Sequence, residues 1–398
     1  MHLTVISHKV CTPSDQLPTG YKTDGGFPLQ IGAISELFSS TEVVVPCESA
    51  GNSVGLSPLH GRNVTVNPVT IPLGTGFWRK IDMLRWVTTN GPTIWRAVRN
   101  ADAVHAPIPG DVGTIGMVFA LILRKRLFVR HCGNWLAPRT TAERLWKWTM
   151  ERFAGGRNVM LATGGSAEPP SSRNAEVRWI FSTSLRSEQM LKNTPRDCPR
   201  DGELRLIIAC RQEERKGTDV VIDALPSIAE AYPGVTLEVV GGGSLLESLK
   251  LQADRVGIGD RVVFHGKVEQ AEVVRLLKTA HLFCYPTSAS EGFPKVVLEA
   301  LAAGLPVITT RVSVLPRLIE SGCGKLLNEG TPAALAEAVI EICADPAAYG
   351  QMSRNAIATA RQYTLEKWRD LIGQMLCESW KIDRLDNYDQ NMVCRENQ

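Results

Sequence analysis

A regular alternation of short β-branched segments with amphipathic segments constrains the fold of this chain more than any other feature. The second half predicts strands near 204–210, 235–240, 261–265, 281–285 and 306–310. It predicts helices near 217–231, 244–256, 269–279, 294–303, 332–344 and 346–362. Strands that alternate with helices form parallel sheets covered by the connecting helices. The sequence therefore predicts an α/β protein.

The first half carries the same alternation less regularly. It predicts strands near 2–7, 42–46, 63–70, 102–106, 126–131, 158–162 and 177–181. It predicts helices near 26–39, 77–99, 111–124 and 138–154, the second interrupted at Gly91-Pro92. The two halves share only this general alternation, which indicates two Rossmann-like domains.

The length of 398 residues exceeds one ordinary core and fits two domains. Residues 183–203 are rich in Thr, Ser, Pro and Arg with weak periodicity, and we expect the interdomain linker there. The predicted domains are 1–190 and 200–362, followed by a helix over 363–383.

Charge and cysteine usage exclude several classes of protein. The formal net charge of +3 gives no global field that would favour nucleic acid. No apolar run approaches the ~20 residues that span a bilayer, and Met1 to Ile6 has the pattern of a strand and not of a signal peptide. The ten cysteines show no CxxC or Cys/His ligand spacing. They predict reduced structural thiols and a cytoplasmic protein.

Three loops that follow predicted strands carry the chemistry, because ligands of doubly wound sheets bind at the carboxyl ends of strands. The first loop is Arg211-Gln-Glu-Glu-Arg-Lys216-Gly217. Arg211 is expected at the strand tip and Lys216 at the start of the next helix, where the two cations could hold a diphosphate. A solvated charged loop is the alternative.

The second loop, Gly241-Gly242-Gly243-Ser244, lets the backbone approach a ligand and offers N–H groups to anions. A plain tight turn explains it about as well, since it lacks the spacing of a dinucleotide fingerprint or a P-loop lysine.

The third loop, Ser288-Ala-Ser-Glu291-Gly-Phe-Pro294-Lys-Val-Val-Leu-Glu299-Ala, is the most specific. Pro294 suits the first turn of a helix whose N-terminus could bind a phosphate. Glu299 is the only acid in an otherwise apolar helix, where it needs polar partners such as ribose hydroxyls. The alternative is a capping acid followed by one salt-bridged helical Glu.

These residues resemble the donor-binding domain of the retaining glycosyltransferases of family 4, the group 1 glycosyltransferases. The resemblance covers residues 204–345 and rests on Arg211…Lys216-Gly217, Val239-Val240-Gly241, Phe264-His265-Gly266 and Glu291-Gly-Phe-Pro…Glu299. It implies the GT-B fold, two Rossmann-like domains facing across a cleft. The first would bind the acceptor, the second the nucleotide sugar, and the last helix would cross back onto the first.

The resemblance also implies roles for residues of the second half. Arg211 and Lys216 would contact the diphosphate, Glu299 the ribose, and Glu291 the donor sugar. Backbone amides would contact sugar and phosphate over Phe293, Pro294, Lys295 and Val296, and the backbone of Gly266 and Lys267 would flank the base. Transfer would retain configuration and use no bound metal or other cofactor. The sequence agrees in showing no DxD-like acidic cluster beside these loops.

The first half offers fewer candidates. Gly25 and Gly26 end a long loop after the first strand and match a glycine pair that faces the diphosphate in relatives. His131 matches a histidine near the donor sugar or acceptor, although the Arg-His-Cys-Gly-Asn-Trp pattern departs from the family's His-Asp-like form. A flexible loop and a structural histidine are the alternatives.

Two segments mix bases with aromatic or apolar neighbours, namely 77–86 and Arg124-Lys125-Arg126. Such a surface could dock on a membrane at its inner face. The alternative, which we favour, places Trp78, Ile81 and Trp86 partly in the core with a solvated basic face.

The sequence thus predicts a hexosyltransferase that moves a sugar from a nucleotide-sugar donor to a glycan or lipid-linked acceptor in polysaccharide or cell-envelope glycan synthesis. A nucleotide-sugar epimerase or hydrolase would need further catalytic acids. A non-catalytic nucleotide-sugar-binding protein of the same fold is the other alternative. Nothing in the sequence supports nucleic-acid binding.

Overall fold

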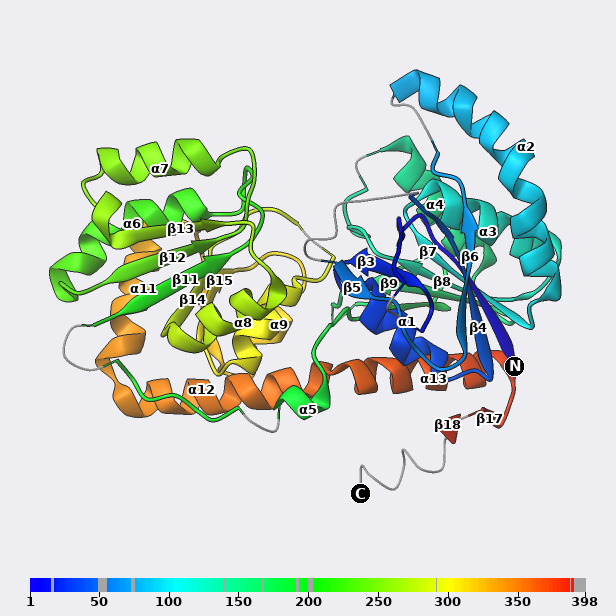
Figure 1. Ribbon diagram of the computed structural model, residues 1–398. Helices are drawn as coiled ribbons and strands as arrows, with labels where there is room; N and C mark the ends of the chain where they lie inside the picture. The colour runs from blue at the N-terminus through cyan, green and yellow to red at the C-terminus, as the bar shows by residue number, and fades with distance from the viewer. Residues whose placement is uncertain are drawn as a thin grey trace. The chain divides into compact units, whose positions relative to one another are not determined.

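The computed structural model describes residues 1–15, 18–48, 56–72, 76–138, 140–166, 168–190, 193–199, 203–290, 292–386, 388 and 389. The side chains of residues 76–81, 388 and 389 lie outside this description. The chain divides into two compact units (Figure 1). Unit 1 combines Met1–Ser184 with Leu365–Gln398, and unit 2 is Leu185–Thr364.

Unit 1 contains these strands: β1 (His2–Ile6), β2 (Thr12–Pro13), β3 (Tyr21–Asp24), β4 (Ser40–Pro46), β5 (Leu56–Pro58), β6 (Val64–Val69), β7 (Ala103–Ile108), β8 (Arg126–His131), β9 (Asn158–Thr163), β10 (Val177–Ile180), β17 (Arg384–Leu385) and β18 (Tyr388–Asp389). Its helices are α1 (Phe27–Ser35), α2 (Gly76–Asn100), α3 (Asp111–Ile122), α4 (Thr141–Phe153) and α13 (Leu365–Trp380).

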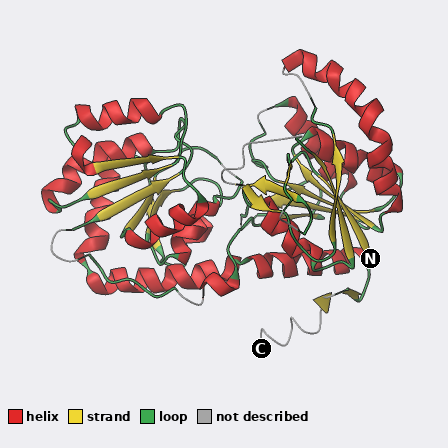
Figure 2. Cartoon of the chain, in the orientation of Figure 1, coloured by secondary structure: helices red, strands yellow, loops and turns green. Residues whose placement is uncertain are grey.

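The main sheet of unit 1 is parallel, in the order β10-β9-β8-β7-β1-β4-β6. Alternate residues of its strands enter two separate cores. Leu3 and Val5 of β1 pack with α1 and α13, whereas Ile6 packs with α2, α3 and α4. Helices therefore cover both faces of the sheet (Figure 2), and Trp368 of α13 belongs to the first core.

Unit 2 contains the strands β11 (Arg205–Ala209), β12 (Thr236–Val240), β13 (Val262–Gly266), β14 (Leu282–Tyr285), β15 (Val307–Thr310) and β16 (Gly324–Leu327). Its helices are α5 (Ser187–Met190), α6 (Thr218–Ala231), α7 (Leu246–Arg255), η1 (Gly259–Arg261), α8 (Gln270–Thr279), α9 (Lys295–Ala302), α10 (Leu315–Ile319), α11 (Pro332–Ala344), α12 (Pro346–Ala360) and η2 (Arg361–Tyr363).

The sheet of unit 2 is also parallel, in the order β13-β12-β11-β14-β15-β16. The strand order reverses between β11 and β14, which makes their carboxyl ends the topological switch point where doubly wound sheets bind ligands. The sheet and its helices share one core. The α/β prediction with two Rossmann-like domains is confirmed.

Three local predictions were wrong. Helix α2 runs unbroken through Pro92, because the loss of one backbone hydrogen bond, about 3 kcal/mol, is offset by burial of Trp86 and Ile94 on either side. The loop before Gly25 contains β2 and β3, which pair with β5 in a small antiparallel sheet. Strand β16 was missed, since Gly324-Lys325-Leu-Leu has no alternating pattern.

The segment expected to be a linker is fixed to unit 2 by Arg196. Its guanidinium donates to the carbonyls of Ala303, Ala280 and Leu277 at 2.6, 2.6 and 3.0 Å. These carbonyls lie at the C-terminal ends of α8 and α9, where backbone acceptors are unpaired and the helix dipole favours a cation. The side chain therefore ties residues 193–199 to the domain that follows.

In the described part of the chain, no helix is long and apolar enough to cross a membrane. The nine described cysteines are all free. Burial raises the pKa of Cys210 to about 11 and of Cys47 to about 11, which makes both thiols unreactive near neutral pH.

Candidate functional site

Two loops meet at the switch point of unit 2, one after β11 and one after β14. Gly217 allows them to approach each other, because it takes φ = 89° and a Cβ there would lie 2.6 Å from the carbonyl oxygen of Pro286. Only glycine satisfies both conditions without strain. The tight approach expected at Gly217 therefore exists, and it joins the two loops.

Arg215 holds the two loops together, a role that no sequence pattern predicted. Its backbone is left-handed, with φ = 68°, and its carbonyl oxygen accepts from the amides of Ser288 and Ala289 at 2.9 and 3.1 Å. Its guanidinium donates to the carbonyl of Ser288 at 2.6 Å. The side chain is thus occupied by the neighbouring loop.

Gln212 is a second residue that sequence reasoning missed. It is fully buried, and its amide nitrogen donates to the carbonyls of Cys210 and Val240 at 3.0 and 3.1 Å. Its amide oxygen accepts from the hydroxyl of Thr218 at 2.6 Å. Gln212 therefore holds the loop between β11 and the first turn of α6. In the sequence, the only sign of this role is that Gln212 is a neutral amide between the charged residues Arg211 and Glu213.

Gly241, the first glycine of the run after β12, is needed for close backbone packing and not for binding an anion. A Cβ on Gly241 would lie 1.9 Å from the carbonyl oxygen of Cys210, and φ is +115°. The amide of Gly241 donates to the carbonyl of Gly266 at 2.8 Å. Its N–H is therefore not free for an anion, contrary to the expectation for the run as a whole.

The two predicted cations differ in environment. The Arg211 side chain is 73% exposed and pairs with Glu213 at 3.1 Å, and such surface pairs contribute about 0–1 kcal/mol. An incoming anion can therefore displace Glu213. Lys216 is only 7% exposed and lies two residues before α6. The predicted helix start was too early because left-handed Gly217 is the N-cap.

Helix α9 begins beside these loops. Pro294 is the N-cap of α9 and therefore precedes its first turn. Its carbonyl oxygen accepts a hydrogen bond from the backbone amide of Val297 at 3.1 Å. The Pro294 side chain makes no capping hydrogen bond, and the first turn of any helix carries backbone N–H groups that have no partner within the helix. Glu299 is half-buried in the middle of the helix. Glu291, the other acid of the motif, lies outside the described residues.

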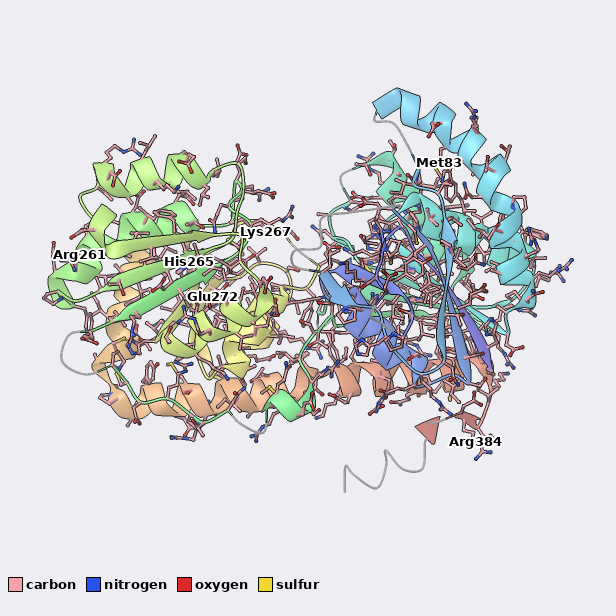
Figure 3. The ribbon with its side chains drawn as sticks, viewed as in Figure 1. Met83, Arg261, His265, Lys267, Glu272 and Arg384 are labelled. Carbon is pink, nitrogen blue, oxygen red and sulfur yellow. The ribbon has the colours of Figure 1, made fainter. Side chains whose placement is uncertain are left out.

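The remaining predicted residues of unit 2 lie at the same edge of the sheet. Phe293 packs against Tyr363 with ring centroids 5.8 Å apart, and Lys295 and Val296 are half-buried in the first turn of α9. Gly266 ends β13, and Lys267 follows it, exposed. Figure 3 shows Lys267 and Arg261 at opposite ends of β13.

A cavity of about 330 Å³ lies at the carboxyl ends of β14, β15 and β16 and reaches the loop between β11 and α6. Arg215, Ser288 and Arg311 line it, whereas Arg211 and Lys216 do not. The two predicted phosphate-binding cations, of which Arg211 is exposed and Lys216 is buried, are therefore not part of the lining of this cavity.

The candidates of unit 1 occupy the carboxyl edge of its own sheet. His131 ends β8, is 2% exposed and contacts Trp135 edge-on with ring centroids 5.4 Å apart. Burial lowers the pKa of His131, so the ring is neutral near pH 7 and can accept a proton. Gly25 and Gly26 join β3 to α1, with open space around the left-handed Gly25.

His105 lies within β7. It stacks on Phe128 at a centroid distance of 4.0 Å and is buried. Burial, aided by the nearby Arg130 charge, lowers the pKa of His105 to about 3. Its role is structural.

Comparison with known proteins identifies the part of the chain that carries the site. Residues 195–361 match the family model described as glycosyl transferases group 1. Over 145 residues the chain is 35% identical to a phosphatidyl-myo-inositol mannosyltransferase of Mycobacterium leprae, which covers 36% of this chain and 38% of that protein. This part of the chain is similar to the group 1 glycosyltransferases.

The likeness is broader in two other comparisons. A D-inositol 3-phosphate glycosyltransferase of Arthrobacter is 28% identical over 276 residues, covering 57% of this chain and 65% of that protein. The alignments thus span less than two thirds of these relatives. The crystal structure of Anabaena HepE in complex with UDP and glucose superposes with a TM-score of 0.70 and 20% identity, over 95% of this chain and 100% of that one. The whole chain therefore has the GT-B fold.

The two loop residues that the sequence did not predict, Gln212 and Arg215, lie in the range that matches the family model. They hold in place the loop in which Arg211 and Lys216 lie. A site that must bind a charged ligand gains precision when its loops are fixed before the ligand arrives.

Proposed function

We propose that the protein is a retaining glycosyltransferase that moves a sugar from a nucleotide-diphosphate sugar to a glycan or lipid-linked acceptor. One observation carries the proposal: at the switch point of unit 2, the loop bearing Arg211 and Lys216 is locked to the loop leading into α9. That arrangement brings two cations and the N-terminus of α9 to one edge of the sheet. These groups suit a diphosphate.

Each residue then has a chemical role. Arg211 exchanges Glu213 for a diphosphate oxygen, and Lys216 supplies a second positive charge. Glu299 accepts hydrogen bonds from the ribose hydroxyls. The backbone of Gly266 and Lys267 flanks the base. The first turn of α9, from Phe293 through Pro294 and Lys295 to Val296, offers its amides to the phosphate and sugar.

Three further roles concern Glu291, which lies outside the described residues, and His131 and the glycine pair, which lie in unit 1. Glu291 contacts the donor sugar on the face opposite attack. His131, neutral because its pKa is lowered by burial, accepts a hydrogen bond from the sugar or the acceptor. Gly25 and Gly26 present backbone to the diphosphate, and the open space around Gly25 leaves room for such contact.

The chemical step follows from the charge distribution. The bond between the anomeric carbon and the diphosphate oxygen breaks, and the acceptor oxygen bonds to the anomeric carbon on the same face. The acceptor proton passes to the departing phosphate oxygen. Arg211, Lys216 and the α9 dipole stabilise the negative charge that develops on the diphosphate, so no bound metal is required.

The acceptor assignment draws on the relatives. Several act, by their names, on phosphatidylinositol lipids, and three are named as GDP-mannose-dependent. The Anabaena structure holds UDP. A lipid-linked acceptor fits polysaccharide or cell-envelope glycan synthesis by a cytoplasmic enzyme at the inner face of the membrane. The donor is therefore best sought among GDP and UDP sugars.

A panel of GDP and UDP sugars tests the proposed activity through slow donor hydrolysis or transfer to lipid extracts. We expect turnover of one donor, with the anomeric configuration retained in the product observed by NMR. Binding of a donor without release of its sugar to any acceptor or to water would favour the non-catalytic alternative. Inversion would refute the retaining mechanism.

A further inference from the structure

A second polar cavity lies in unit 1, at the amino ends of β7, β8 and β9. This edge of the sheet is opposite the one that carries His131. The cavity measures about 490 Å³. The residues that give it its character are Arg124, Lys125, Arg126, Arg157, Lys381 and Trp380. We call it the basic pocket.

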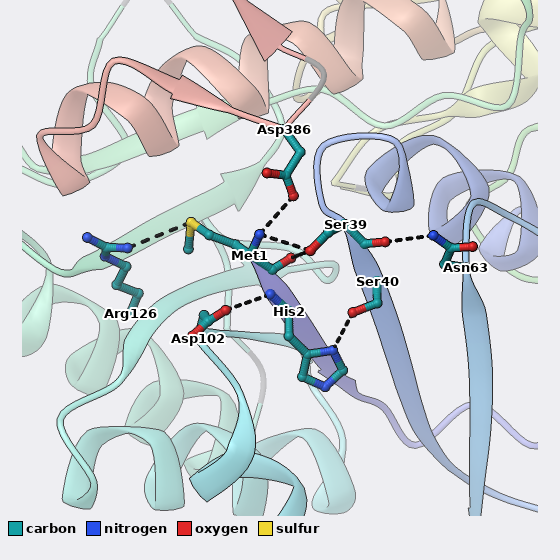
Figure 4. Close-up of polar contacts among 8 residues, drawn as sticks. All are labelled: Met1, His2, Ser39, Ser40, Asn63, Asp102, Arg126 and Asp386. Carbon is teal, nitrogen blue, oxygen red and sulfur yellow. Dashed lines mark hydrogen bonds and ion pairs between the residues drawn. The ribbon is translucent and has the colours of Figure 1, made fainter.

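The positive charge of the basic pocket is not balanced by its surroundings. Among the described residues that line it, Asp102 is the only acid beside five cations. The carboxylate of Asp102 accepts from the backbone amide of His2 at 2.7 Å (Figure 4). Asp102 keeps its charge in this contact and offsets one of the five cations, so the lining retains a net positive charge of four.

The contacts of three cations involve neutral partners. Lys125 Nζ donates to the carbonyls of Arg99 and Ala101 at 2.6 and 2.8 Å. Arg126 lies over the ring of Trp380, 5.9 Å from its centroid, and Arg157 donates to a backbone carbonyl. These contacts position the side chains and leave their charge uncompensated.

Arg124 and Lys381 are the most informative residues of the pocket. Arg124 follows the end of α3 with φ = 52°, and Lys381 follows α13 with φ = 53°. Glycine usually occupies this left-handed position after a helix, because a Cβ is disfavoured there. Two cations in disfavoured backbone conformations, both lining one cavity, indicate a function for their side chains.

The surrounding chain strengthens the local field. Residues 76–157 hold 14 Lys and Arg against five Asp and Glu, a net charge of +9. The whole chain carries +3, so the remaining residues carry −6. Positive charge is thus concentrated in the part of unit 1 that forms the pocket, which raises the local concentration of anions.

Exposed apolar side chains lie close in sequence to two residues of the pocket. Ile122, two residues before Arg124, is 61% exposed, and Phe153, four residues before Arg157, is 40% exposed. Exposed apolar groups beside a cluster of Lys and Arg suit the boundary between lipid headgroups and acyl chains.

We propose that the basic pocket binds a phosphate group of an anionic ligand, and the exposed apolar side chains close to it in sequence favour a phospholipid headgroup over a soluble phosphate. Arg124 and Lys381 contact the phosphate, and Arg126 and Arg157 add charge from the sides. This site is distinct from the donor site, and the proposal does not rest on the proposed function.

The test compares the full chain with the double variant R124G/K381G. Glycine suits both left-handed positions, so we expect a melting temperature at least equal to that of the parent. Vesicles of phosphatidylcholine, with and without phosphatidylglycerol, probe the lipid source by co-sedimentation. Inorganic phosphate, titrated by calorimetry, probes the soluble source.

The matched control is R255A/K278A, which removes two exposed cations from the last turns of α7 and α8 in unit 2. We expect at least about tenfold weaker binding in R124G/K381G and less than about a twofold change in the control. Binding only to vesicles containing phosphatidylglycerol identifies a lipid headgroup, and binding only to phosphate identifies a soluble ligand. Either supports the site.

Three results would overturn the proposal. These are that the parent protein binds neither probe, that R124G/K381G retains full binding, or that both variants weaken binding equally. The last result would assign binding to net charge alone.

Discussion

The two units use their surfaces differently. In unit 2, buried polar groups such as Gln212 and the backbone of Arg215 hold the site loops in place. In unit 1, the helices of one face expose large apolar side chains. Among the described residues, Leu84, Val118, Ile122, Leu136, Leu145, Trp148 and Phe153 are exposed in unit 1, against Leu251 and Val263 in unit 2.

Sequence similarity is strongest in unit 2, whereas fold similarity extends over both units. The family model matches residues 195–361, one relative aligns over 57% of the chain, and the structural match covers 95% of the chain. Loops that are held by specific contacts tolerate few sequences. A surface that meets varied partners tolerates many. Unit 2 therefore carries the recognisable motifs, and unit 1 carries what is particular to this protein.

The largest effect should come from a substitution in the fixed loops. Gly241→Ala places a methyl 1.9 Å from the carbonyl oxygen of Cys210 in a left-handed backbone, and we expect a loss of at least about 4 kcal/mol in the free energy of unfolding. Gly25→Ala is the control in unit 1, where φ is +72° but nothing lies within 4 Å. Its cost should be about 1–2 kcal/mol. Urea unfolding measures the free energy of unfolding of both variants. Equal losses in the two variants would contradict the expected difference between the two units.

Removal of Arg196 should come next. Arg196→Ala leaves the carbonyls of Ala303, Ala280 and Leu277 without a donor, at an expected cost of about 3 kcal/mol. Unit 2 should lose stability while unit 1 keeps its own. Hydrogen exchange resolves the two units. A uniform change in protection would show that they unfold together.

Acid should destabilise unit 1 through His105. Its folded pKa of about 3 lies below the ordinary value of 6.5, so between these values the unfolded chain binds a proton that the folded chain excludes. Stability is complete above pH 6.5 and falls by up to about 1.4 kcal/mol per pH unit below it. His105→Phe should flatten this slope in acid unfolding of unit 1. In unit 2, His281 has a pKa lowered by burial to about 4 and should contribute less, because it is partly exposed.

The smallest expected effect is that of metal removal. If the cations of unit 2 neutralise the diphosphate, the transfer rate with EDTA should stay within about twofold of the rate without EDTA. Steady-state rates before and after chelation measure this. Loss of activity with EDTA and its return with Mn²⁺ would show that Arg211 and Lys216 are insufficient.

Much of the fold follows from the sequence, because buried parallel strands and amphipathic helices leave strong periodic patterns. The sequence could nominate Arg211, Lys216, Glu299 and the start of α9 as candidates because they lie in the loops and helices that follow such strands. Gln212 and Arg215 could not, since their roles depend on backbone carbonyls that no sequence pattern shows. Trp86 is buried and donates to Thr70 O at 2.7 Å, as the favoured core interpretation requires. Trp78 and Ile81 lie outside the described side chains.

The central claim concerns the carboxyl edge of the unit 2 sheet, and β11 offers an internal control for it. Arg211 follows the carboxyl end of this strand, and Arg205 begins it. Calorimetric titration with the preferred nucleotide sugar should show saturable binding in the parent protein. We expect at least about tenfold weaker binding in Arg211→Ala and Glu299→Ala, and unchanged binding in Arg205→Ala. Equal affinity in the Arg211 and Arg205 variants, or no saturable binding of any nucleotide sugar by the parent, would contradict the account.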